Sequence, residues 1–516
     1  MTTVISEPEV TVSLIPSQSL VGLQEQRILA IGQKVPAGTA TAGELVTSIQ
    51  NDNSWDTSFG ANSMLAGICR NIRKINTTTT LDAIPLDDNG SGVPATGSFA
   101  ITGTATETGT LTFTVGSEED FEFEVTITSG DVANTIGGNV ETAINANTDV
   151  PATASNSTGT VTITADNDGT VGNSIGLKLA GSVAGVSVVI TGMSSGANDP
   201  SFTGLFDVID DRRYQTIIWP YFDDVDTVKN FLDGRFNVVD NVLDGVAHIG
   251  VADTFANLAT LGNANNSQSV VLDADEQISR TLLRGPAITE IPYARAAQIG
   301  GIDALRLTED APIARFVLGQ GTRDRFGGPA LASLPYFNTP VPNLPLMEAQ
   351  DGFTRQERKD LEDDGVSVVG NNRTDTEVLM GQIVTTYKTD AASNPDQTWK
   401  FLNYVRTSSA IREYFFNNLK ARFVQSRLTE GAIHPGRDET NQAVVEAFCT
   451  SLYQQLAGPD FVLVQDGETA LQFFKENLTV TLNLSTGTVT IGMVTPIVTQ
   501  ARKFLVTIRI EFTTEG

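Results

Sequence analysis

Hydrophobic and polar residues alternate through residues 503–512, close to the C-terminus of the chain. A period of two predicts a β-strand with one buried face, because successive side chains of a strand point to opposite sides. The apolar face would carry Phe504, Val506, Ile508, Ile510 and Phe512. Only residues 513–516 follow, so we expect this strand to pair with an earlier edge of its own molecule or with another subunit.

A second alternating segment lies near the N-terminus, in residues 8–16, between Pro8 and Pro16. Its apolar positions are Val10, Val12 and Leu14. Proline at the ends of a strand is compatible with an edge strand and not with the interior of a sheet. We therefore predict two arms: an extended N-terminal arm over 1–25 and a C-terminal arm strand over 496–516.

Residues 90–198 differ sharply in composition from the rest of the chain. They contain eleven acidic residues and one basic residue, Lys178, and are rich in Thr, Gly, Ser and Ala. Alternation over 111–115 and 121–127 around the turn 116–120 predicts a hairpin. Further short strands are expected at 161–164, 175–179 and 186–190, with a helix over 132–147. We predict a β-rich domain inserted between hinges, strongly negative and solvated on most sides.

Apolar runs alternate with helical patterns on both sides of this insertion. The expected strands are 27–33, 214–220, 246–253 and 269–275, and the expected helices are 63–75, 224–243 and 290–306. Alternation at this spacing argues for a parallel, doubly wound sheet. We assign it to a discontinuous α/β core domain formed by 26–89 and 199–340. Four prolines in 334–347 predict an extended connector at its end.

A third unit is predicted over 341–495. It would hold long helices at 399–427 and 441–456, followed by a hairpin at 478–494. The fold class is therefore α+β multidomain: a β-rich outer insertion domain, an α/β middle domain, an α+β C-terminal domain and two extended arms.

Charge and cysteine usage limit the possible partners. The chain has 61 acidic against 33 basic residues, a formal net charge of −28, which disfavours binding to nucleic acid or anionic membranes. Cys69 and Cys449 are the only cysteines, which fits a reducing compartment without a disulfide framework. No run of 18 apolar residues predicts a membrane span. We expect a soluble chain that folds in the cytoplasm.

Patterns typical of catalysis are scarce. His248 lies in an apolar strand and His434 in a loop, and neither has metal-ligand spacing around it. The acidic residues of 222–228 fit capping of a helix better than a calcium loop. The glycine-rich stretch 318–328 lacks the spacing of a phosphate loop. We expect no enzyme activity, no metal and no cofactor.

One stretch is basic against this background. Residues 401–428 contain Arg406, Arg412, Lys420, Arg422 and Arg427 against a single acidic residue, Glu413. An apolar stripe at helical spacing would dock the helix on its own core. The cations either face an acidic partner or neutralise this chain's own carboxylates, and the sequence leaves both interpretations open.

Several stretches, in order, resemble a family. They are "RILAIGQKVPAGTATAGELVTSI" (27–49), "SGANDPSFTGLFDVIDDRRYQTIIWPYFD" (195–223), "FTRQERKDLEDDGVSVV" (353–369), "VLMGQIVTTYKTD" (378–390) and "TWKFLNYVRTSSAIREYFFNNLKARF" (398–423). Together they resemble the contractile tail sheath proteins of myophages, most closely the Mu-like type. The insertion 90–198 is similar to the β-rich domain that many such sheaths display outward.

The resemblance implies a mechanical protein of the virion, assembled in the host cytoplasm. Such sheaths form stacked hexameric rings around a tail tube and contract to drive the tube through the host envelope. The implied partners are copies of the chain, the tube, the baseplate and the tail terminator. Terminal arms of this family complete sheets of neighbouring subunits, which implies the strands in 8–16 and 503–512 here.

Our own assignments add an acceptor and a tube contact. The acceptor would be the hairpin 478–494, through Val480, Leu482, Val489 and Ile491. The cations Arg412, Lys420, Arg422 and Arg427 would face the tube, with 465–477 as an equal alternative. Two other functions stay open: a phage decoration or adhesion protein acting through 90–198, and a hydrolase using the unit 200–330.

Overall fold

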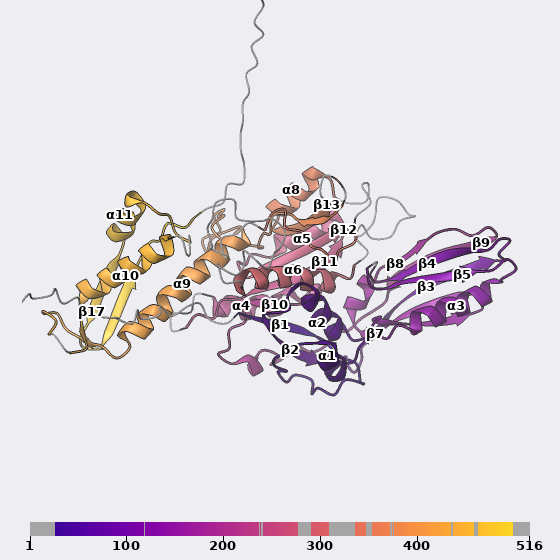
Figure 1. The fold of residues 1–516 in the computed structure, drawn as a ribbon, viewed down its shortest axis with the longest axis horizontal. Helices are drawn as coiled ribbons and strands as arrows, with labels where there is room; N and C mark the ends of the chain where they lie inside the picture. The colour runs from indigo at the N-terminus through magenta and orange to yellow at the C-terminus, as the bar shows by residue number, and fades with distance from the viewer. Residues whose placement is uncertain are drawn as a thin grey trace, which may run out of the picture.

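The computed structural model describes residues 26–117, 119–236, 238, 241–276, 290–308, 336–346, 353–371, 374, 376–434, 437–458 and 463–498. The molecule is elongated (Figure 1), with an α/β domain in the centre, a β-rich domain at one end and a smaller unit of helices and a hairpin at the other. Both predicted arm strands, in 8–16 and 503–512, lie outside the described residues.

A seven-stranded sheet forms the centre, in the order β14-β13-β12-β11-β10-β1-β2. Its strands are β1 (Arg27–Gln33), β2 (Thr80–Leu86), β10 (Thr216–Ile218), β11 (Val246–Asp253), β12 (Val270–Glu276), β13 (Val366–Asn371) and β14 (Val378–Met380). All neighbouring pairs are parallel except β13–β14. The parallel sheet expected from the alternation of strands and helices is therefore confirmed.

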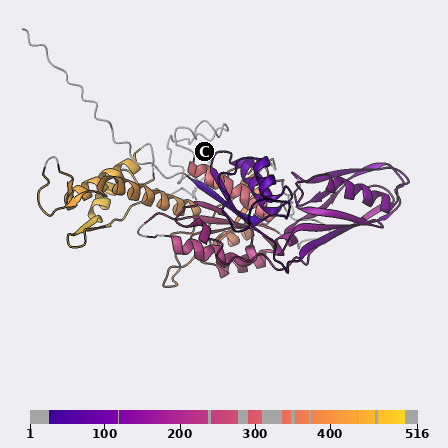
Figure 2. The ribbon, with the colours of Figure 1, turned by 90° about the horizontal axis from the view of Figure 1, so that it is seen from below.

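Helices lie on both faces of this sheet (Figure 2). On one face α2 (Met64–Ile75) packs beside α6 (Pro292–Thr308), and on the other lie α4 (Val225–Arg235), α5 (Phe255–Ala264) and α8 (Arg355–Asp363). A short helix, α1 (Asp52–Phe59), precedes α2. The strands read as continuous apolar runs because both of their faces are covered. None of the helices among the described residues is long and apolar enough to cross a membrane.

Two boundaries differ from the prediction. The α/β domain does not end at residue 340, because β13 pairs with β12 in the register Leu272↔Val366 and so belongs to the central sheet. Strands and a helix assigned to the unit 341–495 are thus part of the core domain. The helix expected over 224–243 is also shorter: α4 ends at Arg235, since Phe236 adopts an extended conformation.

The insertion consists of two antiparallel sheets that share one hydrophobic core. The first has the order β6-β7-β3-β9 and the second β5-β4-β8. The strands are β3 (Pro94–Gly103), β4 (Gly109–Val115), β5 (Glu122–Ile127), β6 (Ala152–Ser157), β7 (Thr160–Asp168), β8 (Leu177–Ala180) and β9 (Val186–Ser194), and the helix is α3 (Ala133–Asn145). The predicted hairpin is confirmed as β4–β5, with Phe113 opposite Phe123.

The C-terminal unit is built around a long helix, α9 (Leu402–Phe423). It continues with β15 (Arg427–Leu428), β16 (Glu439–Thr440), α10 (Gln442–Ala457), α11 (Glu468–Glu476), β17 (Thr479–Asn483) and β18 (Thr488–Gly492). The first turn of α9, at Leu402 and Val405, packs with the central domain, whereas Ile411 and Phe415 pack in a separate core with α10. Helix α9 therefore connects two bodies that have different hydrophobic cores.

Candidate assembly surface

The predicted acceptor hairpin forms, and its four named residues share one face. Strands β17 and β18 are antiparallel, with Val480 opposite Ile491 and Leu482 opposite Val489. Val480 is buried and the other three are partly buried against the core that α9, α10 and α11 make. Thr481 and Thr490 point to the opposite, exposed face. The alternation in the sequence therefore located this face correctly.

Both edges of the β17–β18 sheet are open within the described residues. In the part of the chain that the structure describes, β17 and β18 pair only with each other. A two-stranded hairpin is marginally stable unless a helix or further strands support it. Here α10 supports one face, and each edge offers a row of N–H and C=O groups to an incoming strand. The geometry suits strand addition on either side, in which main-chain hydrogen bonds give affinity and alternate side chains give specificity.

Helix α9 is fixed to the central domain by buried ion pairs. Arg213 donates to Glu413 over 2.7 Å and to the hydroxyl of Ser409 over 2.7 Å. Arg406 is 4% exposed and pairs with the fully buried Asp303 of α6, its Nε donating over 3.2 Å. The direction of α9 is therefore set by charged groups that are almost wholly buried, and α9 in turn sets the position of the hairpin.

His248 belongs to the same buried network. Its Nδ1 lies 2.9 Å from Asp273 and its Nε2 3.2 Å from Asp303. Burial lowers the pKa of His248, but the two carboxylates outweigh burial and raise it to about 9. Burial likewise raises the pKa of Asp303, but Arg406 and His248 reverse this and hold it well below its usual range. The imidazolium and the Asp303 carboxylate are thus mutually charged partners within the core, whereas burial raises the pKa of Asp273.

The sequence did not reveal this network. Asp303 and Arg406 are 103 positions apart, and His248 lies 55 positions before Asp303. The only available indication was that His248 interrupts an apolar strand, since a charged or polar side chain in a buried strand needs a partner. In the described residues no group of three His, Cys, Asp or Glu side chains could hold a metal ion.

The four predicted tube-facing cations divide into two groups. Arg412 turns toward its own molecule, where it contacts Asp244 at 2.5 Å and the carbonyl of Asn241 at 2.8 Å. For this residue the second interpretation, neutralisation of the chain's own carboxylates, describes the structure. Lys420 and Arg422, in the last turn of α9, and Arg427, in β15, are exposed. Only these three are available to a partner.

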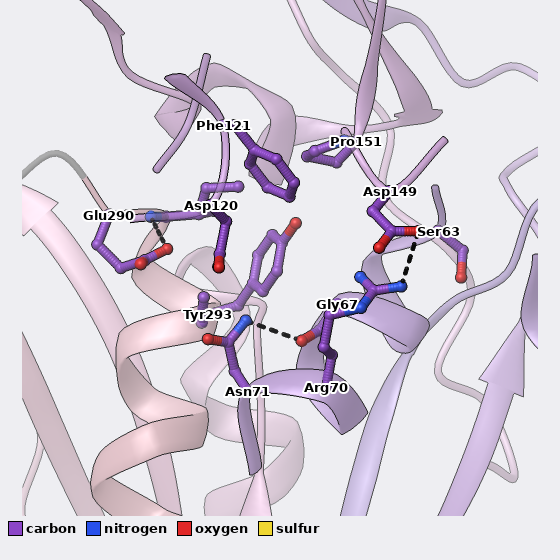
Figure 3. A pocket seen from close by; sticks show the side chains of 12 residues that line it. Ser63, Gly67, Arg70, Asn71, Asp120, Phe121, Asp149, Pro151, Glu290 and Tyr293 are labelled. Carbon is purple, nitrogen blue, oxygen red and sulfur yellow. Dashed lines mark hydrogen bonds and ion pairs between the residues drawn. The ribbon is translucent and has the colours of Figure 1, made fainter. Parts of the chain in front are cut away.

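The joint between the insertion and the core contains the opening shown in Figure 3. It is lined from α2, α6 and the insertion, and Arg70 of α2 pairs there with Asp149 at 3.3 Å. Lys74 pairs with Asp120 across the same joint, and Ser117 donates to Glu290 over 2.9 Å. Burial raises the pKa of Glu290 to about 8. These residues bond to one another across the opening, which makes it a seam between two domains.

Comparison with known proteins finds that the chain is similar to a phage tail sheath protein. No protein-family model matches it. The particular relative is the Mu-like prophage FluMu tail sheath protein of Haemophilus influenzae, which is 26% identical over 439 residues, 83% of this chain and 82% of the relative. This relative is a structural protein and not an enzyme, as predicted for the chain from its sequence.

Two solved structures are also similar. One is the sheath tail protein Lin1278 from Listeria innocua, with 14% identity, a TM-score of 0.46 and 94% of each chain covered. The other is the helical sheath of the anti-feeding prophage in its contracted state, with 10% identity, a TM-score of 0.41, and 98% of this chain and 99% of that chain covered.

Proposed function

We propose that this chain is the repeating subunit of a contractile phage tail sheath. Copies polymerise as stacked hexameric rings around a tail tube, and contraction of the sheath drives the tube through the host envelope. The observation that carries the proposal is the two-stranded β17–β18 sheet, which is open at both edges within the described residues. The relationship to a Mu-like prophage tail sheath protein supports it.

In this proposal the arms complete the open sheet. The strand in 503–512 of one subunit pairs with one edge of the β17–β18 sheet of a neighbour and turns its apolar face toward the neighbour's core. The strand in 8–16 pairs with the other edge. Each arm gains hydrogen bonds and apolar burial, but loses conformational entropy when it is ordered. The net gain per link is small, so the polymer is held by many links acting together.

The elongated shape gives the subunit an inner and an outer end. The C-terminal unit, with Lys420, Arg422 and Arg427 exposed, would face the tube, together with α11, on which Phe473 is 45% exposed. The insertion domain, at the opposite end of the molecule (Figure 1), would face outward. The baseplate and the tail terminator would close the polymer at its ends. The protein would then assemble in the host cytoplasm and reside in the virion.

Electron microscopy of the purified full-length chain tests this function. The proposal predicts tubes with a wide lumen, whereas a chain that stays monomeric under all assembly conditions contradicts it. Deletion of 90–198 distinguishes a decoration or adhesion protein. A sheath subunit should still form tubes without the insertion, because the insertion has its own core. An adhesion protein should lose its function with that domain.

A further inference from the structure

Strand β9 of the insertion domain has an unprotected edge. It is the last strand of the β6-β7-β3-β9 sheet in the portion of the chain that the structure describes. Its nine residues, Val186–Ser194, include no charged residue and no proline. Val189 is 61% exposed and Ile190 is 38% exposed. A long, exposed and apolar edge strand is a template for pairing with another strand.

The other edges of the same domain are protected. On β6 the side chain of Asn145 bonds both main-chain groups of Ala154, at 2.8 and 2.9 Å, and Glu141 accepts from the N–H of Asn156. Strand β5 presents charged residues, and β8 is four residues long with Lys178 near its middle. Because three edges carry devices that block pairing, the absence of such devices from residues 186–191 of β9, before the register shift near its end, is a specific feature of this edge.

The pairing of β9 with β3 determines which main-chain N–H and C=O groups of β9 point to its open edge. The N–H of Ile101 in β3 donates to Gly159, on the side of β7. Main-chain groups alternate along an antiparallel strand, so those of Ala100 point toward β9, where Ala100 lies opposite Val189. Val189 therefore directs its own main-chain groups to β3. Those of Val188 and Ile190 point to the open edge.

We propose that β9 pairs with β9 of a second copy of this chain, antiparallel and about a two-fold axis at Val189. This register sets Val188 opposite Ile190 in a hydrogen-bonded pair, because the main-chain groups of both residues point to the open edge. It also sets Ser187 opposite Thr191, and Val189 opposite its own counterpart in a non-hydrogen-bonded pair. Apolar side chains meet apolar ones and hydroxyls meet hydroxyls, which is the favourable pattern for cross-strand neighbours.

The self-complementary register selects a second copy as the occupant, and the lack of charge along β9 permits the contact. Each chain carries a net charge of −28, and the insertion has eleven acidic residues against one basic residue, so two copies repel wherever carboxylates would meet. The β9 contact brings no carboxylate opposite another. The adjacent outward positions of the sheet are also uncharged: Ser98 lies opposite Thr162 on one side and Thr191 on the other. This surface is therefore one on which acidic copies can approach closely.

The pairing is independent of the proposed sheath lattice. A two-fold contact is isologous and closes after two copies, whereas all subunits of one polar tube share one direction. The pair would join free subunits, or subunits of two tubes that lie side by side. Failure to form tubes and failure to pair through β9 are therefore separate results.

Oxidative crosslinking of the full-length Val189→Cys variant tests the pairing. The two native cysteines, Cys69 and Cys449, are buried. Cα atoms of a non-hydrogen-bonded pair are about 4.5 Å apart, within the range of a disulfide. The matched control is Thr153→Cys, exposed on the protected strand β6. We expect the disulfide dimer to form about tenfold faster at position 189, since only that pair is pre-aligned; equal rates overturn the proposal.

A second substitution checks that the main-chain edge makes the contact. Ile190→Lys added to Val189→Cys introduces a charge of the kind that protects natural edges, and should return the crosslinking rate to that of the Thr153→Cys control. Circular dichroism confirms that each variant is folded. If crosslinking at position 189 is unaffected by Ile190→Lys, the copies associate by another surface and the β9 pairing is wrong.

Discussion

The insertion domain and the C-terminal unit lie at opposite ends of the central sheet, and both contain antiparallel strands (Figure 1). In the insertion, sheets of four and three strands enclose a shared core. In the C-terminal unit a two-stranded sheet rests on helices and is open at both edges within the described residues. The insertion encloses its own core and leaves the β9 edge unprotected, whereas the C-terminal sheet has both edges open within the described residues.

The joints of the two ends differ as well. Helix α9 is held to the central domain by ion pairs, among them Arg406–Asp303, whose side chains are almost wholly buried. The insertion meets the core through partly exposed pairs such as Arg70–Asp149, together with the buried Glu290. Salt should therefore screen the ion pairs of the α9 joint little and those of the insertion joint more, and the buried Glu290 should make the insertion joint respond to pH.

Breaking the buried joint should have the largest effect. Arg406→Ala leaves the carboxylate of Asp303 buried without its main cationic partner, which typically costs about 3–5 kcal/mol. Denaturant unfolding of the full chain measures the loss. The control is Arg422→Ala on the same helix, where the exposed guanidinium should contribute less than about 0.5 kcal/mol. Equal effects of the two changes would show that the joint does not depend on the pair.

The support of the open hairpin can be tested next. Val480 is 4% exposed on the inner face of β17, and its neighbour Thr481 is exposed on the outer face. Val480→Ala should destabilise the C-terminal unit by roughly 1.5–3 kcal/mol, the value of burying such a side chain. Thr481→Ala should change stability little. Hydrogen exchange of the β17–β18 amides reports the difference, and similar exchange in both variants would contradict packing on α10.

A pH titration tests the insertion joint through Glu290. Burial raises the pKa of Glu290 from 4.5 to about 8, so between these values the folded chain holds a proton that the unfolded chain releases. The free energy of unfolding should therefore fall from pH 5 to pH 8 because of this group. In Glu290→Gln this part of the fall should disappear. Unfolding at several pH values measures it, with Glu124→Gln on the exposed face of β5 as the control.

The smallest effect is expected from the exposed cations. Lys420→Glu should leave stability unchanged, because an exposed charge contributes little. Under the proposed function it should weaken co-sedimentation of sheath and tube a few-fold, and most clearly at low salt, where surface charges are least screened. Lys178→Glu, in the outer domain, is the matched reversal and should have no effect. An equal loss of co-sedimentation in both variants would show that the C-terminal cations do not contact the tube.

The predictable parts of the structure were those with a local pattern. The strand Val246–Asp253 was found with its bounds, and the hairpin residues Val480 and Ile491 were placed on one face by alternation alone. The assignment of 366–371 to the central sheet was missed, because it depends on pairing with a strand almost a hundred positions earlier. Arg412 was misplaced for a similar reason, since Asp244 is 168 positions away.

The central claim, that residues 503–512 of one subunit complete the β17–β18 sheet of another, is tested most directly by a matched pair of substitutions. Ile508→Asp places a charge on the predicted apolar face, and Thr507→Asp places the same charge on the predicted polar face. Electron microscopy and sedimentation should show folded subunits in both cases, tubes with Thr507→Asp and none that are stable with Ile508→Asp. Tubes at wild-type yield from Ile508→Asp would contradict the account.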